Sequence, residues 1–101
     1  MDKSKIFGLL TICRKAGRLV TGFDMTAEAM AEGKTALVML ASDISPRTEK
    51  EIRFFAEKKN VNVLKSDISM DEIGSALGKR TGIIAVCDEG FAKRFAELLS
   101  V

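Results

Sequence analysis

The sequence predicts an α/β domain in which helices pack on both faces of a small central sheet. Segments with apolar residues at helical spacing alternate along the chain with short apolar segments. Two of the short segments, residues 36–41 and 83–87, are apolar throughout, which is typical of strands buried on both faces. We therefore expect a three-layer α/β/α sandwich with five helices and a mixed sheet of about four strands.

The first predicted helix covers residues 4–16, where apolar residues recur at helical spacing, and it ends at Gly17. A minimal strand, residues 19–20, follows. The second predicted helix covers residues 24–32 and ends at Gly33. Its N-cap is expected to be one of two polar residues, Thr21 or Asp24. The first doubly buried strand, residues 36–41, comes next.

The third helix is expected to begin at Ser45-Pro46, a capping residue followed by a proline in the first turn. Its inner stripe is predicted to hold Ile52, Phe55 and Ala56. A short strand over residues 61–64 follows.

Ser69 and Glu72 have the spacing of a capping box and predict the start of a fourth helix, which ends at Gly78. The second doubly buried strand, residues 83–87, leads into a fifth helix over residues 89–99. The apolar residues predicted to point inward from these two helices are Met70, Ile73, Leu77, Phe91, Phe95, Leu98 and Leu99.

Length and composition fit an ordinary globular protein. A chain of 101 residues has the size of one domain, so a single domain over residues 1–101 is expected. The net charge of +2 provides no global basic field that would by itself indicate nucleic acid. Charge is nevertheless unevenly distributed along the chain. The charged residues within 1–22 are mostly basic, and those within 23–45 are mostly acidic.

The N-terminal segment resembles a secretory signal, because lysines precede the apolar run 6–13. Arg14 and Lys15 follow that run at once and no small-residue cleavage site comes after them, so an amphipathic helix is the better interpretation. No apolar run reaches the roughly 18 residues that a membrane span needs. Cys13 and Cys87 lie in apolar surroundings and are expected to be buried free thiols in a reducing cytosol. We expect a cytoplasmic protein with no membrane partner.

The chain lacks the residues on which most enzymatic catalysis depends. There is no histidine, which removes the common general base at neutral pH and the partner that a nucleophilic cysteine needs. The segment Gly78-Lys79-Arg80-Thr81 has some likeness to a phosphate-binding loop, but Arg80 interrupts the pattern and the segment follows a helix instead of a strand. We expect no enzymatic activity, no small-molecule substrate, no cofactor and no metal.

Two segments in the first half of the chain carry a family resemblance. They are residues 14–22, Arg-Lys-Ala-Gly-Arg-Leu-Val-Thr-Gly, and residues 32–43, Glu-Gly-Lys-Thr-Ala-Leu-Val-Met-Leu-Ala-Ser-Asp. Together they resemble the ribosomal-protein family of L-seven-Ae and L-thirty-e. Residues 71–79 resemble the glycine-containing helix of that family, and residues 88–93 resemble its bacterial YlxQ-like branch. The order and spacing of these motifs cover nearly the whole chain.

The resemblance implies an α/β/α sandwich that binds structured RNA, typically a kink-turn, in which a sharp bend lies beside sheared G·A pairs. The family recognises this RNA with the N-terminus of the second helix and two flanking loops. Free N–H groups at a helix N-terminus attract phosphate, and RNA is recognised mostly by shape and splayed bases. The matching positions in this sequence are Gly22, Phe23, Asp24, Met25, Glu28, Ser42, Asp43, Ile44, Lys79, Arg80, Thr81 and Gly82.

The helix start departs from the family pattern of asparagine-glutamate-x-x-lysine, because it reads Asp24-Met-Thr-Ala-Glu28 here. Glu28 replaces a lysine that is expected to face RNA, and this charge reversal should cost affinity. Arg18 is expected to lie beside the helix start. The cations expected to compensate are Arg14, Lys15, Arg18, Lys79 and Arg80.

Two roles remain open for Phe23, which either packs the helix start on the core or stacks on an RNA base. The stripe of Arg47, Lys50 and Arg53, mixed with glutamates, is interpreted as a solvated face. Our first hypothesis is an RNA-binding module that is ribosomal-protein-like or ribosome-associated, with ribosomal RNA as its expected partner. The alternative is a protein-interaction module that kept the fold and lost kink-turn recognition, which the near-neutral charge and the acidic second helix motivate.

Overall fold

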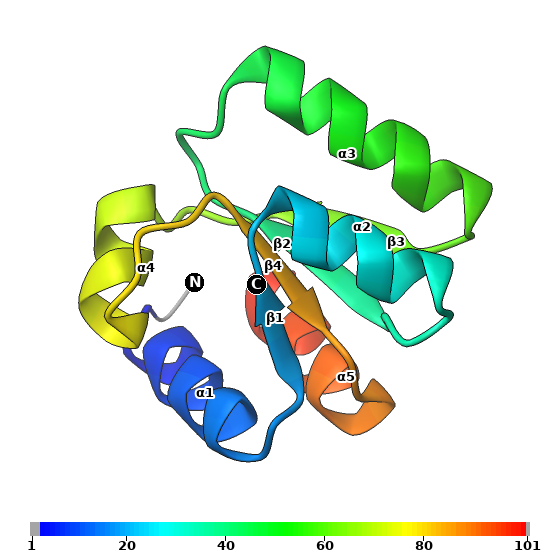
Figure 1. Ribbon diagram of the computed structural model, residues 1–101. Helices are drawn as coiled ribbons and strands as arrows, with labels where there is room; N and C mark the ends of the chain where they lie inside the picture. The colour runs from blue at the N-terminus through cyan, green and yellow to red at the C-terminus, as the bar shows by residue number, and fades with distance from the viewer. Residues whose placement is uncertain (1–2, 101) are drawn as a thin grey trace.

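The computed structural model describes residues 3–100, in which helices and strands alternate along the chain (Figure 1). The helices are α1 (Lys3–Lys15), α2 (Phe23–Ala31), α3 (Pro46–Lys58), α4 (Met70–Leu77) and α5 (Glu89–Leu99). The strands are β1 (Leu19–Thr21), β2 (Leu37–Leu40), β3 (Asn62–Lys65) and β4 (Ile83–Val86). Within these residues no helix is both long enough and apolar enough to cross a membrane.

The four strands form one mixed sheet in the order β1-β4-β2-β3. Strand β4 is antiparallel to both β1 and β2, and β2 is parallel to β3. Strands β1, β2 and β3 therefore run in one direction and β4 runs in the other. It follows that the C-terminal ends of β1 and β2 and the N-terminal end of β4 lie at the same end of the sheet.

Helices cover both faces of the sheet, which confirms the predicted three-layer sandwich (Figure 1). Strand β2 shows how the two cores arise, because successive side chains point to opposite faces. Val38 and Leu40 pack with buried residues of α2 and α3. Leu37 and Met39 pack with buried residues of α1, α4 and α5, Phe95 among them.

The capping residues that the sequence indicates begin two helices as predicted. Ser45 accepts a hydrogen bond from the Thr48 amide and precedes Pro46 at the start of α3. At the start of α4, Ser69 and Glu72 form the reciprocal bonds of a capping box.

Helix α2 begins differently from the prediction. Its N-cap is Gly22, with φ 91° and ψ 162°, and no side chain caps the helix. The expectation that Thr21 or Asp24 caps α2 is wrong, because Thr21 is still in strand β1 and Asp24 is already the second residue of the helix.

Two side-chain predictions also need correction. Ile52 and Ala56 are buried under α3 as expected, but Phe55 is 42% exposed. Both cysteines are free, and Cys13 is buried whereas Cys87 is only partly so. The Cys13 thiol donates a 3.4 Å hydrogen bond to the Arg18 carbonyl, and burial raises the pKa of this thiol to about 11.

Candidate nucleic-acid interface

Three segments far apart in the sequence meet at one end of the sheet. The Gly22 amide donates a 3.0 Å hydrogen bond to the Ile83 carbonyl, and the Ala41 amide donates a 2.9 Å bond to the Gly82 carbonyl. We call this end of the sheet the rim, and define it as residues 22–25, 41–45 and 80–82. The start of α2 and the chain entering β4 lie side by side there (Figure 1). The rim therefore contains most of the positions that the family resemblance indicates.

The start of α2 supplies the rim with unoccupied backbone donors. The first N–H groups of a helix have no partner inside the helix, and here no side chain replaces one. The Gly22 amide is already bonded to Ile83, so the available donors begin at Phe23. These amides and the positive end of the helix dipole favour a phosphate at this position. Asp24 and Met25 are both exposed beside them.

The loop after β2 is held against the start of α4 by hydrogen bonds. Oδ1 of Asp43 accepts a 2.9 Å hydrogen bond from the Met70 amide, and the Ser42 amide donates a 2.8 Å bond to the Ile68 carbonyl. Ile44 is buried. The Asp43 carboxylate thus serves first to hold the loop, while Ser42 and Asp43 remain exposed at the surface of the rim.

The loop before β4 packs closely against the other parts of the rim. A Cβ atom on Gly82 would lie 3.2 Å from Met70 Sδ and 3.4 Å from Ile44 Cγ1, so a larger residue would require these side chains to shift. The buried Thr81 hydroxyl donates a 3.1 Å bond to the Ile83 carbonyl, so it shapes the loop and does not face a ligand. Nε of Arg80 lies 2.7 Å from Oδ1 of Asp71, and both side chains are largely exposed. This carboxylate, through its hydrogen bond and its charge, raises the pKa of Arg80.

A shallow hollow of about 260 Å³ lies where the three segments meet. Its apolar floor includes Ile44 and Ile83, and the Ser45 and Thr48 hydroxyls at its edge lie 2.8 Å apart. An apolar surface edged by polar groups suits an unpaired RNA base, which presents a flat face and hydrogen-bonding edges. The lining residues are Phe23, Ile44, Ser45, Thr48, Met70, Thr81, Gly82 and Ile83.

Four lining residues of the hollow were not predicted from the sequence, namely Ser45, Thr48, Met70 and Ile83. The capping pattern explains Ser45 and Met70 as helix-start residues. The signal that could have indicated Ser45 is its place directly after residues 42–44, which the family resemblance already assigns to the site.

The structure separates some predicted cations from the rim. The Arg18 carbonyl accepts a 2.8 Å hydrogen bond from the Cys87 amide, which places Arg18 at the opposite end of β1 and β4 from Gly22. The expectation that Arg18 lies beside the helix start is therefore wrong. Lys15 ends α1, just before that same end of the sheet.

Two further predicted cations lie near the C-terminal end of α4. The Arg14 guanidinium donates a hydrogen bond to the Leu77 carbonyl, and Lys79 directly follows the C-cap residue Gly78. Arg80 is the predicted cation that belongs to the rim itself, where it contacts Asp71 near the start of α4. Glu28 lies further along α2, where it is exposed.

Comparison with known proteins agrees with this architecture. The model of the "Ribosomal protein L7Ae/L30e/S12e/Gadd45 family" matches residues 4–96, and the chain belongs to this family. Among its relatives, the "RNA-binding protein YlxQ" of Enterococcus faecium is 29% identical over 97% of this chain and 94% of that protein. The "RNA-binding protein YlxQ" of Bacillus subtilis is 30% identical over 98% of this chain and 99% of that protein.

A solved structure from Bacillus halodurans, of a protein described as having unknown function, has a similar fold. It superposes with a TM-score of 0.87 at 28% identity, over 94% of this chain and 96% of that one.

Proposed function

We propose that this protein is a non-enzymatic, ribosomal-protein-like RNA-binding protein that docks on structured, kink-turn-like RNA through the rim. The observation that carries the proposal is the uncapped start of α2, held between two fixed loops around an apolar hollow. Family membership and the relatives named as RNA-binding proteins support it. They also make the alternative, a protein-interaction module without RNA recognition, the weaker hypothesis. We further propose a cytoplasmic location and ribosomal RNA as the partner.

Each part of the rim has a distinct task in this proposal. The free amides at the start of α2 bind a backbone phosphate, and the hollow receives an unpaired base from the bend of the RNA. Arg80 leaves Asp71 for a second phosphate, an exchange that costs little because solvent screens an exposed ion pair. Asp24 and Glu28 oppose the negative RNA, so shape and hydrogen bonding carry a larger share of the affinity than charge does.

Two variants with the same loss of charge test the position of this site. Arg80→Gln removes the cation nearest the rim, and Arg18→Gln removes one at the other end of the sheet. Fluorescence anisotropy would measure binding to a kink-turn RNA over a range of salt concentrations. We expect Arg80→Gln to weaken binding several-fold and to reduce the salt slope by about one, with Arg18→Gln close to the unaltered protein.

A second RNA, in which Watson–Crick pairs replace the sheared G·A pairs, serves as the control for shape. Equal affinity for the two RNAs, or equal losses from the two variants, would contradict docking through the rim. Crosslinking in cells, followed by sequencing of the attached RNA, would then identify the natural partner.

A further inference from the structure

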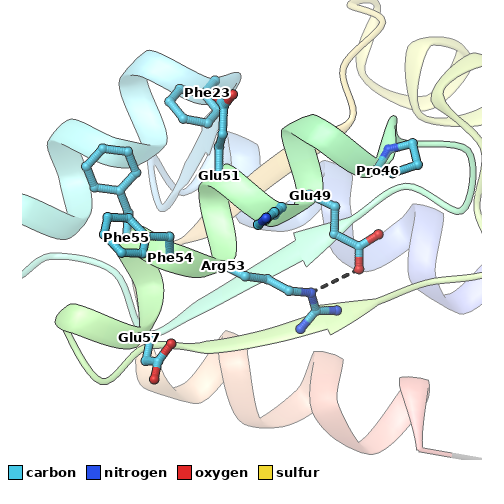
Figure 2. A pocket seen from close by; sticks show the side chains of 9 residues that line it. Phe23, Pro46, Glu49, Glu51, Arg53, Phe54, Phe55 and Glu57 are labelled. Carbon is cyan, nitrogen blue, oxygen red and sulfur yellow. Dashed lines mark hydrogen bonds and ion pairs between the residues drawn. The ribbon is translucent and has the colours of Figure 1, made fainter.

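Three phenylalanine rings form a continuous chain from the rim onto α3 (Figure 2). The Phe23 and Phe55 ring centroids are 6.0 Å apart with an interplanar angle of 76°, and those of Phe55 and Phe54 are 6.2 Å apart at 70°. Phe54 is 56% exposed and Phe55 42% exposed. We call this surface the aromatic platform, defined as Phe23, Phe54 and Phe55. Adjoining exposed aromatic rings on a small protein indicate a contact surface.

The aromatic platform lines an open groove of about 840 Å³ along α3. Phe23 lines both this groove and the hollow at the rim. The groove is therefore continuous with the surface that we propose for RNA, and a strand leaving the rim over Phe23 would meet Phe55 and Phe54 next.

Charges of both signs lie around the groove. Its charged lining consists of three glutamates and two cations, which are Glu49, Glu51, Glu57, Lys50 and Arg53. Over residues 46–65, which span α3 and β3, six lysine or arginine residues outnumber the same three glutamates, so the wider surface carries an excess of positive charge. Two of the glutamates are already neutralised. The Glu49 carboxylate has one oxygen 2.9 Å from Arg53 Nε and the other 3.0 Å from Lys65 Nζ. Oε1 of Glu51 lies 3.1 Å from Arg47 Nε.

Two lysines beside the groove remain available for phosphates. Lys58 Nζ lies 4.3 Å from the centroid of the Phe54 ring, so a cation already sits beside an aromatic face. Among residues 3–100, Lys50 takes part in none of the ion pairs of α3. Exposed aromatic rings with adjacent free cations are the features of sequence-tolerant single-stranded nucleic-acid sites.

We propose that the aromatic platform stacks unpaired nucleotides of the same RNA strand where it leaves the rim. Bases stack on Phe54 and Phe55, and Lys50 and Lys58 contact the adjoining phosphates. This inference rests on the proposed function, because the rim supplies the anchor. It adds a second contact whose affinity depends on single-stranded sequence outside the bend.

Two RNAs distinguish the platform from the rim: a minimal kink-turn and the same kink-turn with a short unpaired extension carrying 2-aminopurine. Phe54→Ala removes the most exposed ring. Ile12→Ala is the matched control, because Ile12 is 57% exposed on a helix of the opposite layer. We expect the extension to tighten binding about tenfold, and Phe54→Ala to abolish that gain while leaving the affinity for the minimal RNA unchanged. Quenching of the 2-aminopurine fluorescence should accompany binding and be lost in Phe54→Ala.

Each other result would overturn the inference in a recognisable way. If the minimal RNA does not bind, the proposed function itself fails. If the minimal RNA binds and the extension adds nothing, the rim stands and the platform is wrong. If light scattering shows a dimer that Phe54→Ala dissociates, the platform is covered by a second copy of the chain instead of RNA.

Discussion

The Met70 amide donates a 2.9 Å hydrogen bond to Oδ1 of Asp43, which joins the loop after β2 to the first residue of α4. This bond sets the loop against the helix whose Met70 side chain lines the rim hollow. The shape of the proposed RNA site therefore depends on the attachment of α4 as well as on α2.

Removing this carboxylate should cost stability and affinity together. We expect Asp43→Ala to lower the free energy of unfolding by about 1 kcal/mol, as for the loss of a helix-capping group, and to weaken RNA binding. Asp43→Asn keeps an oxygen acceptor and should retain most of both. Urea denaturation and RNA titration measure the two effects. An Asp43→Ala protein of unchanged stability would show that the bond does not hold the loop.

Gly22 occupies a backbone conformation that other residues rarely adopt, with φ 91° and ψ 162°. Gly22→Ala should therefore destabilise the protein by about 1–3 kcal/mol, although no heavy atom lies within 4 Å of the added methyl group. Gly8→Ala is the control, because Gly8 lies inside α1 and a Cβ there also meets open space. That change should stabilise the protein by about 0.5–1 kcal/mol. Thermal unfolding of both variants checks the predicted opposite signs.

Acid should weaken the start of α4 through Glu72. A hydrogen bond from the Ser69 amide, and then the Lys3 ammonium, lower the pKa of Glu72 below its ordinary value of 4.5. Because the pKa of this carboxyl is lowered in the folded state, the ionised carboxylate stabilises the fold at pH values above its ordinary pKa. This stabilisation is lost as the pH falls through the pKa of the folded state. We expect the unaltered protein to exceed Glu72→Gln in stability at pH 7, and the difference to shrink below pH 4.5. A difference that stays constant down to pH 2–3 in urea titrations would contradict this role of the carboxylate.

Glu28 should limit the electrostatic part of RNA binding. It is exposed on α2, one turn beyond the free amides, at a position where the family resemblance leads us to expect lysine. Glu28→Lys should tighten kink-turn binding and steepen its salt dependence. Glu32→Lys makes the same charge change at the far end of α2 and should have a smaller effect. Equal gains from the two variants in a gel-shift assay would indicate a general charge effect and not a contact at the rim.

Local sequence signals predicted the elements well because helix starts and stops are set by nearby residues. Ser45-Pro46, Ser69 with Glu72, and Gly78 all act within one turn of the backbone that they cap. Gly22 was not predicted as the N-cap of α2, because glycine has no side-chain hydrogen-bond acceptor. The interpretation of Thr21 or Asp24 as the cap followed from the usual preference for polar caps.

The placement of Arg18 was wrong for a different reason. Arg18 is only four residues from Gly22 in the sequence, but strand β1 lies between them, and an extended strand carries the chain about 3.3 Å per residue. The order and direction of the strands decide which loops share an end of the sheet, and periodicity contains no information on either. The exposure of Phe55 was missed likewise, because helical spacing indicates a face of α3 but not how far its neighbours cover it.

NMR titration with a kink-turn RNA would locate the binding surface, because backbone amides report binding residue by residue. We expect the largest chemical-shift changes at the amides of Phe23, Asp24 and Met25 at the start of α2, with smaller changes at residues 42–45 and 80–82. The amides of Arg18 and Cys87, at the other end of the sheet, should hardly move. Chemical-shift changes centred on Arg18 and Cys87, or none at the start of α2 while RNA binds, would show that the rim is not the RNA-binding surface.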